Sequence, residues 1–130
     1  MINQTNITFV DSWSTSVSSP LSMVDSTITI PGGKILLFVQ QANQAMTLTN
    51  VVVKASDSTG GWSLQLHNLS PQPNAAITIS GNTWLNGQVV IHTASGNHTI
   101  SNLNAQYMSI ALQGTFGQVL TQITAYNTYW

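Results

Sequence analysis

The sequence contains no cysteine, no arginine and no glutamate, and only five of its 130 residues carry a formal charge. These five are Lys34, Lys54, Asp11, Asp25 and Asp57. Without cysteine the chain has no disulfides, no thiolate metal ligands and no thiol nucleophile. Two lysines cannot neutralise enough phosphates to bind nucleic acid appreciably, because that affinity grows with the number of phosphates contacted. The composition therefore excludes disulfide-stabilised proteins, cysteine-based metal sites and enzymes, and proteins that bind nucleic acid through basic residues.

Long hydrophobic runs are also missing. The longest is Ile35–Val39, which is too short for a helix core or for a membrane span. Because it is apolar at every position, we expect a strand in the middle of a packed sheet, covered on both faces. Residues 1–5 have neither the basic nor the apolar stretch of a signal peptide, so we expect none at this position.

Polarity comes instead from amides and hydroxyls, since Asn, Gln, Ser and Thr together supply 54 of the 130 residues. Charged residues make up 4% of the chain, against about 25% in an ordinary soluble domain. Such a surface offers little charge repulsion, which favours association. Its charge also changes little in acid, because few groups titrate. An extracellular or acidic medium suits this composition, and an ordinary secreted β-domain with an uncharged polar surface fits it equally.

Alternating apolar and polar residues indicate strands throughout, with no helical pattern. About nine strand candidates follow one another at roughly 8–12 residue spacing. Turn residues such as 57–61 separate them, and Asn86-Gly87 has the sequence of a type I′ hairpin turn. The pattern predicts a single domain, 1–130, folded as an antiparallel β-sandwich, jelly-roll-like with about eight strands. An immunoglobulin-like sandwich of about seven strands is the alternative.

Nothing in the chain indicates catalysis, a metal or a cofactor. The three histidines, His67, His92 and His98, lack the spacing of metal ligands. No G-x-S-x-G motif is present. The three aspartates do not suggest a pair of carboxylates facing each other across a glycosidic bond. We therefore expect a protein that is not an enzyme and that has no cofactor.

Aromatic residues are the candidates for binding. Trp62 and Trp84 each follow a turn, where an indole would be presented to a glycan or to another subunit; core filling is the alternative, and alternation favours it for Trp62. Tyr126, Tyr129 and Trp130 lie at the end of the sequence. Because chain ends usually fray, three aromatic residues there indicate docking, and a neighbouring subunit is the expected partner.

Four asparagines, Asn3, Asn6, Asn68 and Asn97, stand in N-x-S/T sequons. Asn97 lies in an expected turn and is the best acceptor for glycosylation, with Asn6 and Asn3 as further candidates. Pro71 follows the Asn68 sequon directly and makes that site doubtful.

In composition and strand spacing, the whole chain resembles the single jelly-roll capsid proteins of viruses that infect acidophilic archaea, although no motif carries the resemblance. It implies a coat subunit, in a virion or otherwise extracellular, whose partners are copies of itself and other coat subunits. Direct contact with nucleic acid and a membrane span are not expected. Two alternatives stay open: a carbohydrate- or receptor-binding β-sandwich, and a pilus or surface-layer subunit that donates residues 1–10 as a strand.

Overall fold

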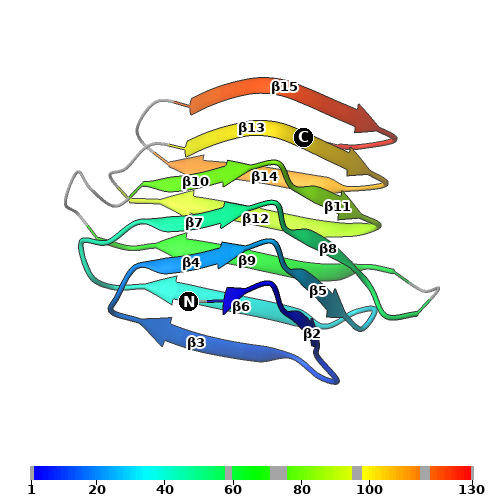
Figure 1. The fold of residues 1–130 in the computed structure, drawn as a ribbon, viewed down its shortest axis with the longest axis horizontal. Coiled ribbons are helices and arrows are strands. Elements are labelled where there is room, and N and C mark those ends of the chain that lie inside the picture. Colours follow the sequence, from blue (N-terminus) through cyan, green and yellow to red (C-terminus); the bar gives the residue numbers. More distant parts are fainter. Residues whose placement is uncertain (1, 58–59, 71–75, 95–97, 115–117, 130) are drawn as a thin grey trace.

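The computed structural model describes residues 2–57, 60–70, 76–94, 98–114 and 118–129. These residues form strands and connections without any helix. Every strand pair in them is parallel. The chain winds upward turn by turn in sequence order, so the strands form one stack (Figure 1). The fold is a parallel β-solenoid, and both the antiparallel jelly roll and the immunoglobulin-like sandwich were wrong.

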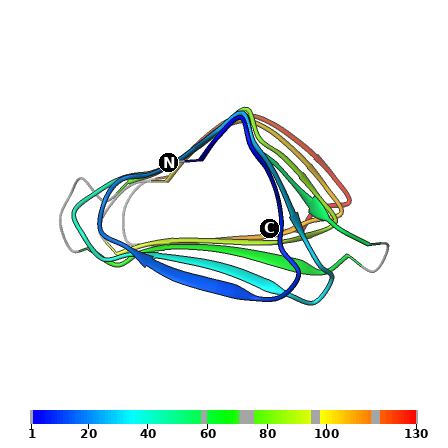
Figure 2. The same cartoon turned by 60° about the horizontal axis from the view of Figure 1, so that its bottom comes forward.

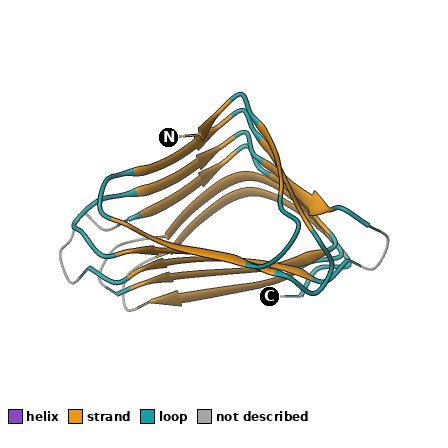
Figure 3. Cartoon of the chain, turned by 90° about the horizontal axis from the view of Figure 1, so that it is seen from below, coloured by secondary structure: helices purple, strands orange, loops and turns teal. Residues whose placement is uncertain are grey.

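The strands of successive turns lie on three faces, which enclose a triangular cross-section (Figures 2 and 3). Face A consists of β1 (Ile2–Asn3), β4 (Leu21–Val24), β7 (Met46–Thr49), β10 (Ile77–Ser80) and the first parts of β13 (His98–Gln106) and β15 (Gln118–Tyr126). Face B consists of β2 (Asn6–Thr8), β5 (Thr27–Ile30), β8 (Val52–Ala55), β11 (Thr83–Leu85) and the later parts of β13 and β15. Face C consists of β3 (Trp13–Val17), β6 (Ile35–Gln40), β9 (Trp62–Asn68), β12 (Gly87–Thr93) and β14 (Ser109–Gly114).

The core fills the triangle with side chains from alternate strand positions. Because the strands are in register, each inward residue stacks on the equivalent residue of the next turn. One column on face A contains Met23, Leu48, Ile79 and Ile100, all at most 1% exposed. Long columns of buried aliphatic side chains supply the main stabilisation, about 1.5–3 kcal/mol for each large side chain removed from water.

The apolar run Ile35–Val39 forms most of β6, but it is covered on one face only. Leu36 and Phe38 point into the core and are 1% and 4% exposed. Ile35 is 43% exposed on the outer side, where Leu37 and Val39 are half-buried. The expectation of a strand covered on both faces was therefore wrong, since no described element packs over the outside of face C.

The corner between faces A and B repeats in every turn. One residue per turn adopts a positive φ there, between 48° and 66°: Gln4, Asp25, Asn50, Gly81, Asn102 and Gln122. Asn, Asp and Gly tolerate this left-handed conformation better than other residues. The next residue turns inward, and at Asn82 its amide nitrogen donates to the carbonyls of Leu48 and Ser80, each at 2.9 Å. This buried amide fixes the corner to the turn below it.

The corner between faces B and C uses the same device. Positive φ recurs at aligned positions in five turns: Gly33, Gly61, Asn86, Tyr107 and Asn127. Asn86-Gly87 is thus a corner that leads from β11 into β12, and not a hairpin turn.

The third corner, between faces C and A, holds loops of varied length, anchored by buried amides. Gln40 Nε2 donates to the Ser19 carbonyl at 2.6 Å, and Asn68 Nδ2 donates to the Gln44 carbonyl at 2.8 Å.

Candidate functional site

The two tryptophans proposed as glycan or subunit contacts are buried. Trp62 and Trp84 are both 0% exposed. The Trp62 indole lies against the backbone of Gly87 and donates through Nε1 to the Leu85 carbonyl at 2.9 Å. Trp84 Nε1 donates to Asn82 Oδ1 at 3.2 Å. Neither ring has a free face, so both fill the core, and the binding role is corrected.

The tyrosines near the C-terminal end are exposed, as a docking role requires. Tyr126 and Tyr129 are 58% and 77% exposed. Tyr126 packs edge-on against Tyr107, with ring centroids 5.5 Å apart. Tyr129 forms an isolated parallel bridge with Ser109, the first residue of β14. In this bridge the Tyr129 N–H donates to the Met108 carbonyl at 2.8 Å. Trp130 lies outside the described residues.

Inward side chains lose their cover at the C-terminal end. Leu120 occupies the same column as Ile100, which is 1% exposed. Leu120 is 43% exposed, because no further turn of the described chain packs over it. The outer edge of β15 likewise has no strand partner among the described residues.

The N-terminal end has the same character. Trp13 shares a column with Leu36, which is 1% exposed, yet Trp13 is 46% exposed. Its ring lies between Phe9 and Phe38, with centroid distances of 5.8 and 5.6 Å. Val10, in the adjoining corner, is 89% exposed. The first turn of the described chain therefore exposes an apolar surface at this end.

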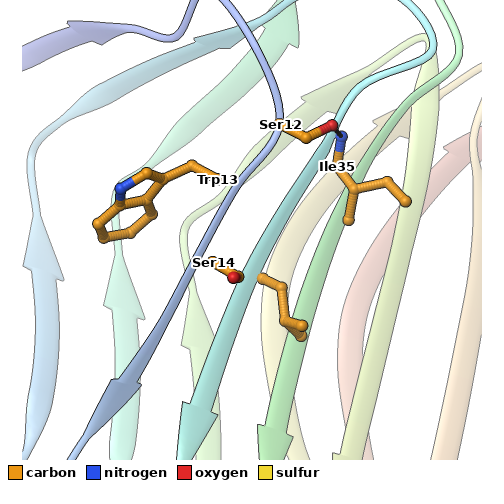
Figure 4. Close-up of a pocket in the computed structure, with 5 residues that line it drawn as sticks. Ser12, Trp13, Ser14 and Ile35 are labelled. Carbon is orange, nitrogen blue, oxygen red and sulfur yellow. Dashed lines mark hydrogen bonds between the residues drawn. The ribbon is translucent and has the colours of Figure 1, made fainter.

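A shallow hollow adjoins this end, at the first strands of face C (Figure 4). It measures about 200 Å³ and is lined by Ser12, Trp13, Ser14, Ile35 and Leu37. Ser12 Oγ accepts a hydrogen bond from the Ile35 N–H at 3.0 Å, as Figure 4 shows. Next to the hollow, Lys34 and Asp11 form an ion pair at 3.1 Å. Hydrogen bonds from the Ser12 N–H and from Lys34, together with the Lys34 charge, lower the pKa of the exposed Asp11 carboxyl group.

A second hollow, of about 320 Å³, lies further along the outer side of face C. It is lined by Leu37, Val39, Gln65, His67 and Leu69. The first lining contains the hydroxyls of Ser12 and Ser14, and the second contains the half-buried imidazole of His67.

The histidines do not form a metal site. His67 and His92 lie on adjacent strands and meet edge to face, with ring centroids 5.6 Å apart. His98 is buried and contacts Thr93 Oγ1 through Nε2 at 3.3 Å. Burial, and then the nearby His92, lower the pKa of His67; burial also lowers the pKa of His98. No cluster of three potential metal ligands occurs among the described residues.

The candidate glycosylation sites differ in access. Asn3 and Asn6 are exposed on β1 and β2. Asn97 lies outside the described residues. Asn68 is 0% exposed and its amide anchors a loop, so its sequon is inaccessible in the folded chain.

Sequence reasoning missed Val10 and Leu120 as surface groups, and it missed the regular rows of serine and threonine hydroxyls on face A. Both features follow from an alignment of the segments that form the corner between faces A and B in successive turns. Such an alignment shows which positions share a column and which described turn is the last.

The fold thus defines an all-β solenoid protein whose distinctive surfaces are two apolar ends and three sheet faces. Comparison of the chain with protein-family models, curated proteins and solved structures finds no match. In the described part of the chain, no helix has the length and apolar character needed to cross a bilayer.

Proposed function

We propose that this chain is a structural subunit that joins copies of itself through the ends of the solenoid, in an extracellular assembly such as a virion coat. One observation carries the proposal. Eight large apolar side chains are exposed among the described residues, and six of them belong to the first turn or to the last two turns. Val10 and Trp13 belong to the first turn; Tyr107, Leu120, Tyr126 and Tyr129 belong to the last two.

The physics of a solenoid explains why these ends favour association. An end strand presents unpaired N–H and C=O groups that can pair with another chain. A solenoid needs polar end caps to remain separate in solution, and here the end positions hold Trp13 and Leu120. With a net charge of −1, electrostatic repulsion between copies is small. The nearly uncharged surface also supports an extracellular setting, because few of its groups titrate and its charge changes little with pH.

Sedimentation velocity over a range of protein concentrations, with electron microscopy of the same samples, tests the proposal. We expect oligomers that grow with concentration. Trp13→Lys and Leu120→Lys place a charge at one end each and should reduce assembly. Leu69→Lys is the matched control, because Leu69 is 47% exposed but lies on the loop after β9, away from both ends.

Mixing the two end variants shows which ends meet. If opposite ends meet, the mixture forms dimers through the two intact ends while each variant alone is monomeric. If like ends meet, each variant forms dimers by itself. A wild-type chain that stays monomeric at every concentration, or a control variant that blocks assembly as strongly as the end variants, would contradict the proposal.

A further inference from the structure

Face A presents a two-column array of hydroxyl groups on its outer side. The register aligns equivalent residues of successive turns directly above one another. One column contains Ser22, Thr47, Thr78 and Thr99, and the other contains Val24, Thr49, Ser80, Ser101 and Thr121. Three consecutive turns therefore carry hydroxyls in both columns.

The array is regular in two directions. Neighbouring strands of a sheet lie about 4.8 Å apart, and residues two apart along a strand are separated by about 6.6 Å. The described strands of face A pair residue for residue from β4 to β13 without a bulge. The side chains therefore repeat on a nearly rectangular grid, with oxygens and threonine methyl groups at fixed intervals.

The side chains of the array have restricted conformations, but their hydroxyls are not used in hydrogen bonds with other described residues. All are half-buried except Thr121, which is exposed. Threonine has few χ1 rotamers on a strand, and stacking within a column restricts them further. No hydrogen bond between described residues engages the hydroxyls of Thr47, Thr78 or Thr99. Their hydrogen-bonding capacity is available to the solvent.

The outer side of face A carries no charged side chain among the described residues. The nearest ionic group is Asp25, which lies in the corner and accepts a hydrogen bond from Asn50 Nδ2 at 3.0 Å. Of the two lysines, Lys54 lies on face B and Lys34 beside the ion-paired Asp11. The absence of charge matters because a charged group orders water around itself in a shell that a crystalline water lattice cannot include.

The other two faces do not carry such an array. The outer columns of face B include Lys54, Leu85 and Tyr126, which differ in size and charge. The outer side of face C carries the apolar Ile35 and Leu37 and the edge-to-face pair His67 and His92. The regularity of face A is therefore not a general result of a composition rich in serine and threonine.

We propose that face A binds the surface of ice. An ice surface is a flat, uncharged lattice of water oxygens whose repeats are close to the grid described above, so hydroxyls can occupy lattice positions while methyl groups fit between them. Many weak contacts made at once, by a face that is already ordered, hold the protein on the crystal at little entropic cost. This inference rests on face A alone and is independent of association through the ends, although copies joined end to end would lengthen the array.

Partition into a growing ice shell and thermal hysteresis test the inference with the full chain. Thr78→Lys/Thr99→Lys breaks the array in two adjacent turns. Thr27→Lys/Thr83→Lys makes the same change at half-buried positions of one outer column of face B and is the control. Circular dichroism at the working temperature confirms that each variant is folded. We expect the wild type and the control to enter the ice and to give thermal hysteresis, and the face A variant to remain in the liquid without hysteresis.

Three outcomes would overturn the inference. The first is a wild-type chain that stays in the liquid. The second is an equal loss of ice binding in the control and in the face A variant. The third is retention on powdered cellulose or chitin without enrichment in ice, which would assign face A to a crystalline polysaccharide.

Discussion

Gly87 provides a sharp test of how the core is packed. A methyl group added at this position would overlap the indole ring of Trp62. Trp62 is 0% exposed and its Nε1 is hydrogen-bonded to the Leu85 carbonyl at 2.9 Å, so the ring cannot move aside without breaking that bond. The φ of Gly87 is not positive, so backbone strain plays no part and the effect of Gly87→Ala is purely steric.

We expect Gly87→Ala to lower the free energy of unfolding by about 2–4 kcal/mol. Forcing an extra methyl into a packed core costs about 1–3 kcal/mol, and loss of the indole hydrogen bond adds about 0.5–1.5 kcal/mol. The total is a large part of the roughly 5–15 kcal/mol that stabilises an ordinary domain. Urea unfolding followed by tryptophan fluorescence measures it directly.

Gly33→Ala is the matched control, since no atom lies within 4 Å of the added methyl and only the positive φ of 74° is unfavourable. It should cost about 1–2 kcal/mol, the penalty of the left-handed conformation. Trp62→Phe supplies the second arm, because a smaller ring leaves space for the methyl. In the double variant Gly87→Ala/Trp62→Phe, the loss should be smaller than the sum of the two single losses. Additive losses, or a Gly87→Ala variant within about 0.5 kcal/mol of the wild type, would refute the packing.

Acid should destabilise the fold. His67 and His98 have a lowered pKa in the folded chain, so the unfolded chain binds protons more readily, and the stability present above about pH 6.5 is lost as the pH falls through the lowered values. Urea midpoints measured from pH 8 to pH 4 should decline, and His92→Gln should make the decline shallower; a flat profile would contradict the burial of these rings. Asn82→Ala should cost about 2–4 kcal/mol, because it removes two buried hydrogen bonds and leaves the Trp84 N–H without its acceptor. A loss below about 1 kcal/mol in urea unfolding would show that the buried amide does not hold the corner.

The histidines also qualify the argument made from composition. Few groups titrate in acid, which suggested a surface suited to an acidic medium. The structure places His98 in the core and His67 against His92, so protonation acts on the packing and not only on the surface. An acid-stable assembly would have to compensate for this through contacts between subunits.

The all-β class could be predicted from the sequence, but the direction of the strands could not. Period-two alternation is the same in parallel and antiparallel strands. The turn signals were equally ambiguous, because Asn86-Gly87 supplies a positive φ for a solenoid corner as well as for a hairpin. Regular spacing of short strands then favoured a sandwich, the commoner arrangement.

A repeat that decides between these folds is present in the sequence. Six segments, 2–7, 23–28, 48–53, 79–84, 100–105 and 120–125, begin and end with a residue of an inward column and place Gln, Asp, Asn or Gly at the third position. Their starts lie 20 to 31 residues apart, because the loops at the other corners vary in length, so no fixed period appears. The similar triplets Thr78-Ile79-Ser80 and Thr99-Ile100-Ser101 belong to adjacent turns in register and are part of this repeat.

The exposed ends could not be predicted without that repeat. Trp13 and Leu120 have the sequence pattern of core residues, and only their place in the first and last turns exposes them. Conversely, Trp84 follows a turn and was a candidate surface group, but the inward columns of adjacent turns enclose it. For Trp62, alternation with its neighbours favoured the core position that the structure shows.

The in-register stacking of successive turns is the feature on which both proposals depend, and paired spin labels measure it most directly. The chain has no cysteine, so spin labels attach only to the cysteines introduced in the double variant Thr78→Cys/Thr99→Cys. A second double variant, Thr47→Cys/Thr99→Cys, places the two labels two strands apart and provides a longer distance. We expect strong dipolar broadening of the electron paramagnetic resonance spectrum for Thr78→Cys/Thr99→Cys, whose backbones lie about 4.8 Å apart, and weaker broadening for the longer pair. A spectrum for the adjacent pair that equals the sum of the two singly labelled spectra would contradict the solenoid.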